Sequence, residues 1–279
     1  MADLNVIAER LIAAFDNAAL LPPITAKEAN FSVADGYTVL AEIERRRRAQ
    51  GWQSVGRKIG FTNRTIWPRY GVYQPMWAHV WTRTVHFAAD GKPTLPLNGL
   101  VQPRIEPEVV FKLKASPPVS DDPSAMLSCI EWIAPGFEIV QSHFPDWKFG
   151  AADCTAACGL HGALVIGATT PVTDTNRATL AAMLPAFELT LSRGGSVIDR
   201  GTESNVLGSP LLALAHLVRL LAQQPQAPSL QAPSLAAGEI VTTGTITDAW
   251  PVTPGEIWSS HYGRLGINGM SLRFDEPAR

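Results

Sequence analysis

Three glutamates in apolar surroundings are the residues of this chain most able to do chemistry. Glu106 and Glu108 stand two apart just before the apolar residues 109–111, a pattern that predicts a strand with both carboxylates on one face. Glu138 lies inside a second apolar run, residues 133–140, which also predicts a buried strand. Ionised carboxylates are costly in such surroundings unless a cation compensates their charge. Oxygen ligands without a neighbouring Cys or His pair favour Mg²⁺ or Mn²⁺, with Ca²⁺ as an alternative.

The Glu-x-Glu spacing also has a plainer interpretation. On most strands it marks the solvated face of an antiparallel sheet, because acidic side chains are seldom buried. The apolar surroundings of Glu138 favour the metal site over this alternative.

Two basic residues complete the local candidates. Lys58 lies between Gly56 and Gly60 in an apolar stretch, and taken alone it is more typical of a surface lysine on an edge strand. Arg104 precedes Glu106 by two positions, so it shares the face of the glutamates if they point inward. Its guanidinium could then pair with a metal ligand or bind an anionic substrate through two hydrogen bonds.

Other common catalytic patterns are missing from the sequence. It contains no His-Glu-x-x-His or His-x-His pair, no Gly-x-Ser-x-Gly elbow and no phosphate-binding loop. The cysteines, Cys129, Cys154 and Cys158, are odd in number and lack a second pair at zinc-ligand spacing. These absences disfavour a serine hydrolase, a nucleotide-phosphate site and a zinc site.

Two amphipathic helices are predicted at the N-terminus. Asp3 can cap the first helix, and Ser32 with Asp35 forms a capping-box pattern for the second, which ends near Gly51. The apolar stripe of the first helix consists of Leu4, Ile7, Leu11 and Phe15. The basic run at residues 45–48 predicts a solvated helix end, because cations stabilise the C-terminal end of the helix dipole.

Short strands and turns are predicted for most of the remaining chain. A hairpin with a Gly194-Gly195 turn is expected over residues 190–198, and one clear helix over residues 211–221. Residues 226–230 and 231–235 repeat the sequence Gln-Ala-Pro-Ser-Leu, which predicts an exposed loop insertion.

Composition narrows the class of protein. With 279 residues, 46% of them hydrophobic, the chain can form one large domain or two modest ones. A formal net charge of −2 argues against a nucleic-acid partner. No apolar run approaches membrane-spanning length and the N-terminus has no signal-like core, so we expect a soluble, cytoplasmic protein without a membrane partner.

The segment around the first two glutamates resembles a known family. Residues 100–108, Leu-Val-Gln-Pro-Arg-Ile-Glu-Pro-Glu, are similar to the metal-binding segment of the 2-keto-4-pentenoate hydratases, which belong to the fumarylacetoacetate hydrolase superfamily. The resemblance covers nearly the whole chain, and further similar segments occur in the family's order. These segments are residues 56–62, 130–138, 201–211 and 235–245.

The resemblance implies an α+β fold. An N-terminal helical or αβ segment, residues 1–75, would precede a catalytic domain, residues 76–279, built as a mixed β-sandwich or roll like that of fumarylacetoacetate hydrolase. Members of the family usually form homo-oligomers, so a dimer or an assembly of dimers is expected. The low charged content, 17%, suits an enzyme with much of its surface buried in an oligomer.

Roles for the candidate residues also follow from the resemblance. Glu106, Glu108 and Glu138 would hold Mg²⁺ or Mn²⁺. Lys58 matches the family's Gly-x-Lys-[Ile/Val]-Gly segment and would line the active site. A bound cation would lower its pKa and let it act as an acid/base or hold a substrate carboxylate.

A turn near the C-terminus is the second implied part of the pocket. In the family, the segment matching Thr243, Gly244 and Thr245 borders the pocket, so its hydroxyls and backbone amides would bind the substrate carboxylate. Without the resemblance, the same segment is an ordinary tight turn at the end of a strand.

The sequence departs from the family at three polar positions. Met76 stands where the hydratases carry an acidic residue, and His143 replaces the arginine that follows Ser142 in the family. Residues 152–156, Ala-Asp-Cys-Thr-Ala, stand in place of Ala-Asp-Asn-Ala-Ser. The groups that would position water are therefore not the expected ones.

Two explanations of these departures remain open. His79 or His143 could take over as the acid/base. Alternatively, the substrate is different and bulkier, with Trp77 and Trp81 lining its pocket.

The implied activity is that of a metal-dependent hydro-lyase of aromatic-compound catabolism. It would add water to a 2-oxo-enoate derived from a 2-hydroxy-dienoic acid, while Lys58 shuttles a proton between the enol and keto forms. A 2-oxo-enedioate decarboxylase, or a C–C bond hydrolase of an acylpyruvate-type substrate, would use the same enolate. A paralogue that binds a small-molecule 2-oxo acid without turnover, or serves as a subunit partner, is the alternative from another class.

Overall fold

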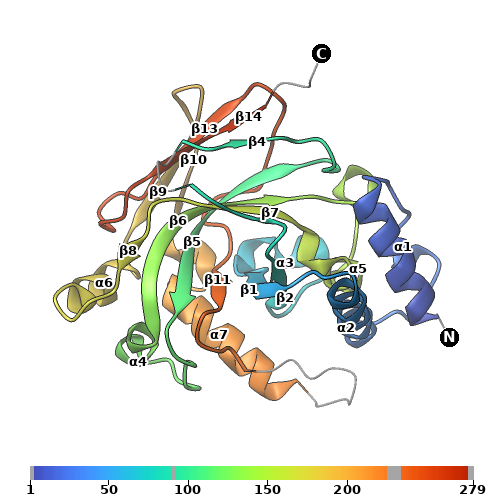
Figure 1. Ribbon diagram of the computed structural model, residues 1–279, viewed down its shortest axis with the longest axis horizontal. Helices are drawn as coiled ribbons and strands as arrows, with labels where there is room; N and C mark the ends of the chain where they lie inside the picture. Colours follow the sequence, from blue (N-terminus) through green and yellow to red (C-terminus); the bar gives the residue numbers. More distant parts are fainter. Residues whose placement is uncertain (1–2, 89–91, 225–233, 276–279) are drawn as a thin grey trace.

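The computed structural model describes residues 3–88, 92–224 and 234–275, and within them it contains a larger and a smaller β-sheet with helices beside them (Figure 1). The strands of the larger sheet are, in spatial order, β2 (Met76–Trp81), β1 (Ser54–Gly60), β11 (Ile240–Thr242), β5 (Arg104–Leu113), β6 (Ile130–Val140), β7 (His161–Ile166) and β3 (Val85–Phe87). Two short strands extend it, with β12 (Trp250–Pro251) pairing with β5 and β8 (Thr170–Pro171) pairing with β6.

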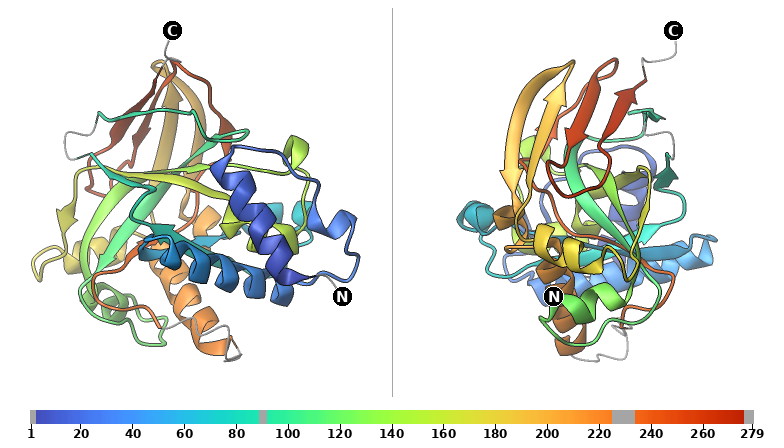
Figure 2. Two further views of the ribbon diagram at one scale, coloured as in Figure 1. Left: turned by 45° about the vertical axis from the view of Figure 1, so that its right-hand side comes forward. Right: turned by 90° about the vertical axis from the view of Figure 1, so that its left-hand side faces the viewer.

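The smaller sheet stands at the end of the molecule opposite the main helices (Figures 1 and 2). Its strands are, in spatial order, β10 (Ser196–Thr202), β9 (Glu188–Arg193), β13 (Ile257–His261), β14 (Met270–Phe274) and β4 (Thr94–Leu95). The helices are α1 (Leu4–Asp16), α2 (Val33–Ala49), α3 (Trp67–Tyr70), α4 (Pro123–Ser128), α5 (Ala151–Ala156), α6 (Arg177–Met183) and α7 (Pro210–Gln223). Helices followed by mixed sheets confirm the predicted α+β class.

Both N-terminal helices begin at their predicted caps. The Asp3 side chain accepts hydrogen bonds from the first backbone amides of α1, and Ser32 with Asp35 forms the expected capping box of α2. From the predicted stripe of α1, Ile7 and Leu11 are buried. The two helices pack on each other, and α2 also packs on α5, which carries pocket residues described below.

The basic end of α2 is solvated at Arg45 and Arg48, as predicted, but not at Arg47. Arg47 is buried, its Nη2 lies 2.7 Å from an Asp16 carboxylate oxygen, and its guanidinium lies 4.3 Å from the ring centroid of Trp52. One residue of the run thus fastens α2 to α1, because an arginine can combine an ion pair with stacking on an aromatic ring.

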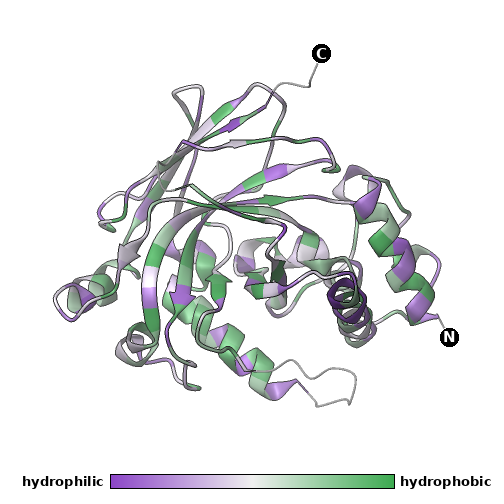
Figure 3. Ribbon diagram, viewed as in Figure 1, coloured by the Kyte–Doolittle hydropathy of each residue, from purple (hydrophilic) through white to green (hydrophobic). Residues whose placement is uncertain are grey.

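The predicted hairpin and helix of the second half are both present. β9 and β10 pair around Gly194 and Gly195, whose φ angles of 57° and 86° suit a glycine turn. α7 includes the predicted residues 211–221, and Figure 3 shows it coloured mainly as hydrophobic. The predicted loop insertion at residues 226–235 lies outside the described residues except for its last two positions, where Leu235 is buried.

The stretch Glu203–Gln223, which includes α7, is long and apolar enough to cross a membrane by length and composition. The expectation that no apolar stretch approaches that length was therefore too strict. The core helix of a globular protein passes the same test, and the α7 residues Leu211, Leu214 and Leu217 are buried in the core. The stretch is therefore weak evidence for a membrane span.

The N-terminal segment contributes directly to the larger sheet. The boundary expected between residues 75 and 76 falls between β1 and β2, which pair antiparallel with Lys58 opposite Ala78. On its other side, β1 pairs parallel with β11, with Lys58 aligned to Thr242. Residues 54–60 therefore belong to the sheet that carries the glutamates.

Replacement of Gly56 by alanine tests how closely β1 must approach β11. A Cβ atom at this position would lie 1.8 Å from the carbonyl oxygen of Ile240, a backbone atom that cannot move without breaking the parallel pairing. We expect Gly56→Ala to lower the free energy of unfolding by about 3 kcal/mol in urea titrations. Gly60→Ala is the matched control, because its Cβ would meet side chains and no backbone atom, with Met76 Sδ at 3.3 Å and Lys58 Cε at 3.9 Å. Equal stability of the two variants would contradict this account.

Candidate active site

The pairing of β5 with β6 brings the three glutamates together. Glu106 lies directly opposite Glu138 in this antiparallel ladder, and Glu108, two residues further along β5, faces the same side. One carboxylate oxygen from each residue lies within 4.8 Å of the others. Glu108 and Glu138 are only 1% and 0% exposed, so the interpretation as a solvated face is wrong.

Crowding and burial shift the pKa values of the first two glutamates upward. Burial, assisted by the charge of Glu138 and opposed by Lys58, raises the pKa of Glu106 to about 7. Burial and the charges of Glu138 and Glu106 raise the pKa of Glu108 well above its usual value. The three carboxylates can ionise together only if positive charge enters between them. This oxygen-only donor set and its short separations fit a hard divalent cation such as Mg²⁺, Mn²⁺ or Ca²⁺.

Glu138 is the carboxylate that the protein itself keeps ionised. Lys58 donates from Nζ to its Oε2 at 2.8 Å, and His161 Nδ1 lies 2.7 Å from its Oε1. Burial alone would raise the pKa of Glu138, but these two partners outweigh burial and lower it. Two opposed hydrogen bonds also fix the orientation of this carboxylate in the site.

Lys58 is a buried residue of an interior strand, not a surface lysine on an edge. It is 3% exposed, and β1 lies between β2 and β11. Burial alone would lower its pKa, but the three carboxylates, Glu138 foremost, outweigh burial and raise it. The resemblance implies a lowered pKa for Lys58 when a cation is bound. The cation would neutralise these carboxylates and so remove the interaction that raises the pKa of Lys58 without metal.

His161 is a site residue that the sequence did not predict. Its Nδ1 carries the proton toward Glu138, because an ionised carboxylate can only accept, and its Nε2 lies 2.7 Å from Thr84 Oγ1. His161 lies on β7 beside an irregularity in the β6–β7 pairing, between Ile139 and Val140. A register irregularity of this kind has no local sequence signal.

Gly244 orients Glu108 through a backbone hydrogen bond. Its backbone amide donates to Glu108 Oε2 at 2.8 Å, and its φ angle of +94° lies in the region that favours glycine. A Cβ atom there would lie 2.0 Å from Thr62 Oγ1, so the close approach also requires glycine.

The threonines on either side of Gly244 differ in their surroundings. Thr245 lines the cavity described below, and its hydroxyl donates to the backbone carbonyl of Thr247. Thr243 is buried and its hydroxyl donates to the carbonyl of Val109 in β5, so it holds the turn against the sheet and does not face the cavity.

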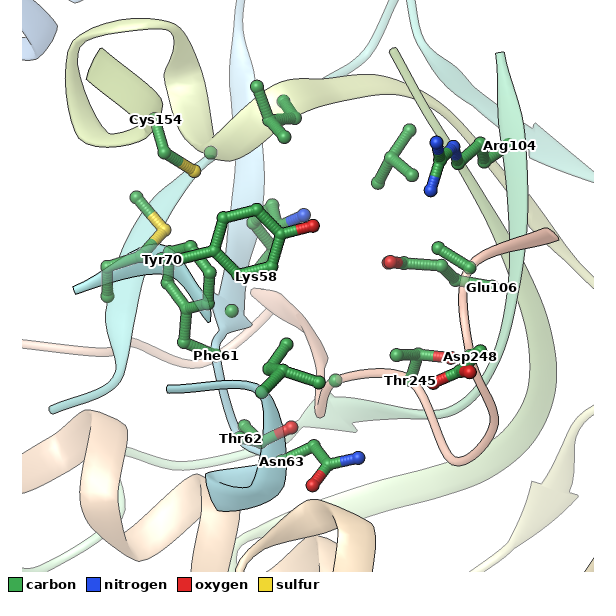
Figure 4. Close-up of a pocket in the computed structure, with 18 of the residues that line it drawn as sticks. Lys58, Phe61, Thr62, Asn63, Tyr70, Arg104, Glu106, Cys154, Thr245 and Asp248 are labelled. Atoms are coloured by element: carbon green, nitrogen blue, oxygen red, sulfur yellow. The ribbon is translucent and has the colours of Figure 1, made fainter. Parts of the chain in front are cut away.

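A cavity of about 160 Å³ lies over Lys58, Glu106 and Glu108. Figure 4 shows Glu106 and Arg104 on one side of it, facing Lys58 and Tyr70 on the other. The guanidinium carbon of Arg104 lies 4.0 Å from the ring centroid of Trp147. Among the described residues Arg104 forms no ion pair, which leaves its guanidinium available for an anion.

Aromatic residues form much of the remaining wall of the cavity, and no sequence pattern predicts that they lie close together. The rings of Tyr70 and Phe149 stack with centroids 5.1 Å apart, and the rings of Phe61 and Tyr70 lie 5.7 Å apart. These rings come from α3, from the segment after β1 and from the segment before α5. Only the tertiary fold brings them together around one cavity.

His79 does not reach this cavity, which corrects one of the two acid/base expectations. In the β1–β2 pairing Ala78 lies opposite Lys58, so the next residue, His79, lies opposite Arg57 and points to the other face of the sheet. Its Nδ1 lies 3.0 Å from Ser54 Oγ. Burial foremost, with Arg57 nearby, lowers the pKa of His79 to about 3, so this imidazole is neutral at physiological pH.

His143 does not line the cavity either. Its Nδ1 donates to the backbone carbonyl of Ala19 at 3.0 Å, which ties the segment after β6 to the end of α1. It borders a separate small cavity together with Trp81 and Cys158. Burial lowers the pKa of His143 as well.

The expected tryptophan wall is also wrong, for the reason that excludes His79. Trp77 and Trp81 alternate with the inward residues of β2; Trp77 stacks on Tyr37 and donates to Gln224 Oε1. The two departures that do line the cavity carry sulfur, namely Met76 and Cys154. The pocket is therefore apolar where the family places polar groups.

Known proteins with similar sequences include two enzymes that span nearly the whole chain. No protein-family model matches the sequence. The 2-hydroxyhexa-2,4-dienoate hydratase of Comamonas testosteroni is 31% identical over 274 residues, covering 96% of each chain. A 4-oxalocrotonate decarboxylase from a Pseudomonas species is 30% identical over 250 residues, covering 89% of this chain and 90% of that one.

Solved structures with similar folds agree with these relatives. The 4-oxalocrotonate decarboxylase of Pseudomonas putida G7, complexed with magnesium and adipate, matches with a TM-score of 0.84 at 25% identity and 97% coverage of both chains. A yeast fumarylacetoacetate hydrolase family protein matches with a TM-score of 0.56 at 14% identity, covering 80% of this chain and 93% of that one, and so shows the fold alone. Because the similarity spans nearly the full length of these relatives, the chain belongs to the 2-keto-4-pentenoate hydratase family, and it has the fold of the fumarylacetoacetate hydrolase family.

Proposed function

We propose that this chain is a divalent-metal-dependent lyase that takes a 2-hydroxy-dienoic acid, as its 2-oxo-enoate form, and adds water to it. The observation that carries this proposal is the buried triad Glu106, Glu108 and Glu138, with Lys58 Nζ 2.8 Å from Glu138, beneath one cavity. The similarity to a 2-hydroxyhexa-2,4-dienoate hydratase supports it.

The triad is the proposed holder of Mg²⁺ or Mn²⁺. When bound, the cation would supply Lewis-acid polarisation of the 2-oxo group. The protein orients two of the ligands before any ion arrives, because Lys58 and His161 hold Glu138 and the Gly244 amide holds Glu108. A similar decarboxylase whose structure contains magnesium supports this choice of ion.

Lys58 is the proposed acid/base between the enol and keto forms. Its ammonium group donates a hydrogen bond to Glu138, so it carries a proton that it can deliver to C3 of the substrate. Arg104 is the proposed anchor for the substrate carboxylate, since its guanidinium faces the cavity without an ion pair among the described residues. Gly244 and Thr245 form the neighbouring wall, whereas Thr243 serves only to hold their turn.

Decarboxylation of a 2-oxo-enedioate is the second candidate. Met76 supplies no carboxylate to activate water, and decarboxylation requires no such group. Arg69 and Arg104 both line the cavity and could hold a second substrate carboxylate. Similarity to a 4-oxalocrotonate decarboxylase supports this alternative.

A C–C bond hydrolase of an acylpyruvate is less well supported, because it would need a base beside the cation to activate water.

A non-catalytic 2-oxo-acid-binding paralogue is disfavoured by the same residues. Such a protein has no evident need for both a buried carboxylate triad and a lysine paired with it.

We further propose a cytoplasmic homo-oligomer, a dimer or an assembly of dimers, because of family membership and the low charged content of 17%. Its other partner would be the small-molecule 2-oxo acid.

A direct assay separates these functions. We expect purified protein with Mg²⁺ or Mn²⁺ to consume 2-hydroxypenta-2,4-dienoate, followed by its ultraviolet absorbance, and to yield 4-hydroxy-2-oxopentanoate. A chelator should abolish the reaction, because the 2-oxo group is no longer polarised. Release of CO₂ from a 2-oxo-enedioate, without hydration of the dienoate, would favour the decarboxylase. Metal binding with neither reaction would contradict the lyase proposal.

Replacement of Lys58 by methionine tests its proposed role in proton transfer. Methionine fills similar space but carries no proton, so kcat should fall by about 10²–10⁴-fold in the same assay. Magnesium binding, measured by calorimetry, should persist because the three carboxylates remain. The exposed Lys114→Met variant is the matched control and should retain full activity. A Lys58→Met enzyme with near wild-type kcat would remove Lys58 from the mechanism.

A further inference from the structure

The chemistry proposed above requires a second proton-transfer group, at the far end of the substrate. Ketonisation of 2-hydroxypenta-2,4-dienoate places a proton on C5, and water then adds at C4. Lys58 lies at the triad, where it can serve C3 beside the 2-oxo group. Because the substrate would extend away from Arg104 and Glu106, where its 1-carboxylate and 2-oxo oxygens would be held, the group that serves C5 and C4 must lie on the wall across the cavity from these two residues.

Tyr70 occupies that wall. Figure 4 shows its hydroxyl directed into the cavity, across from Glu106. The side chain comes from the last residue of α3. Its ring is fixed between neighbours, because it stacks on Phe149 at 5.1 Å with an interplanar angle of 14° and contacts Phe61 at 5.7 Å. Such packing holds a phenol in one orientation before substrate binds.

The Tyr70 hydroxyl is also unengaged. It has no hydrogen-bond partner among the residues that the structure describes, although it can both donate and accept. Three other side chains of the cavity are less suited to proton transfer, namely Thr245, Met76 and Cys154. Thr245 donates its proton to the carbonyl of Thr247, and Met76 has none to give. Burial raises the pKa of the Cys154 thiol to about 12, so its thiolate is scarce.

We propose that Tyr70 is a catalytic residue that gives its hydroxyl proton to C5 of the substrate and recovers a proton from the water that adds at C4. This inference rests on the proposed hydratase function. The 2-hydroxyl proton passes to solvent, and the C5–H bond forms as the Tyr70 O–H bond breaks. The phenolate then takes a proton from water as the water oxygen bonds to C4. The enolate left at C3 takes the Lys58 proton, which solvent renews.

Tyr70→Phe is the test, because it keeps the stacked ring and removes only the hydroxyl. With Mg²⁺ present, hydration of 2-hydroxypenta-2,4-dienoate should slow by about 100-fold or more. Hydrogen–deuterium exchange at C3 of 2-oxopentanoate in deuterium oxide, followed by nuclear magnetic resonance, should be unchanged, because it needs Lys58 and not Tyr70. Magnesium affinity measured by calorimetry should also be unchanged. Tyr73→Phe, three residues away and 86% exposed, is the matched control and should behave as wild type.

Three results would overturn the inference. A Tyr70→Phe enzyme that hydrates the dienoate as fast as wild type would leave the proposed function intact and remove Tyr70 from it. Equal losses of hydration and of C3 exchange would mean that Tyr70 supports the architecture of the site and transfers no proton. A wild-type protein that exchanges C3 yet leaves the dienoate unchanged would overturn the hydratase proposal together with this one.

Discussion

Mutual repulsion among three buried carboxylates is the constraint on which the rest of this structure depends. The β5–β6 ladder forces Glu106 and Glu138 to lie opposite each other, with Glu108 on the same side. In an apolar interior such an arrangement is unstable without positive charge. Among the described residues, the Lys58 ammonium and the hydrogen bond from His161 offset part of this repulsion, and both are directed at Glu138. Glu106 and Glu108 keep raised pKa values, and a divalent cation is the simplest species that would let them ionise.

The architecture around the triad can be understood as the means of bringing these partners to it. β1 carries Lys58 and reaches the sheet by a parallel pairing with β11 so close that Gly56 has no room for a side chain. The turn after β11 places the backbone amide of Gly244 where it donates a hydrogen bond to Glu108. Aromatic rings form part of the cavity wall beside these charges, and a wall of low dielectric constant strengthens the electrostatic interactions next to it.

Much of this arrangement follows from local sequence rules. The period of two placed Arg104, Glu106 and Glu108 on one face, and capping patterns located the starts of α1 and α2. The resemblance to a known family, and not the local pattern, identified Lys58 as a pocket residue. Its setting between glycines is equally compatible with an edge strand.

The errors share one physical cause, which is that local sequence does not determine long-range register. A strand pattern predicts alternation but not which alternate residues face the site, so His79 was assigned to the wrong face of β2. His161 reaches Glu138 beside an irregularity in the β6–β7 pairing, and Tyr70 of α3 lines the cavity where it stacks on Phe149, in the segment before α5. Each of these contacts joins segments that are distant in the chain.

The linkage between pH, metal and stability tests the central claim most directly. Without metal, a pKa of about 7 for Glu106, above its ordinary 4.5, means that its contribution to stability is complete below pH 4.5 and is lost as pH rises through 7. The cation binds only the ionised carboxylates, so its stabilising effect should grow over the same interval.

The measurement is the melting temperature of the protein with Mg²⁺ and with chelator, at pH 5.5 and at pH 8. The account predicts a larger increase by Mg²⁺ at pH 8 than at pH 5.5, and no increase for Glu108→Gln at either pH. The effect of remote groups on the melting temperature cancels in the difference between Mg²⁺ and chelator, because these groups titrate alike with and without metal. An increase that is equal at both pH values, or absent in the wild-type protein, would contradict the account.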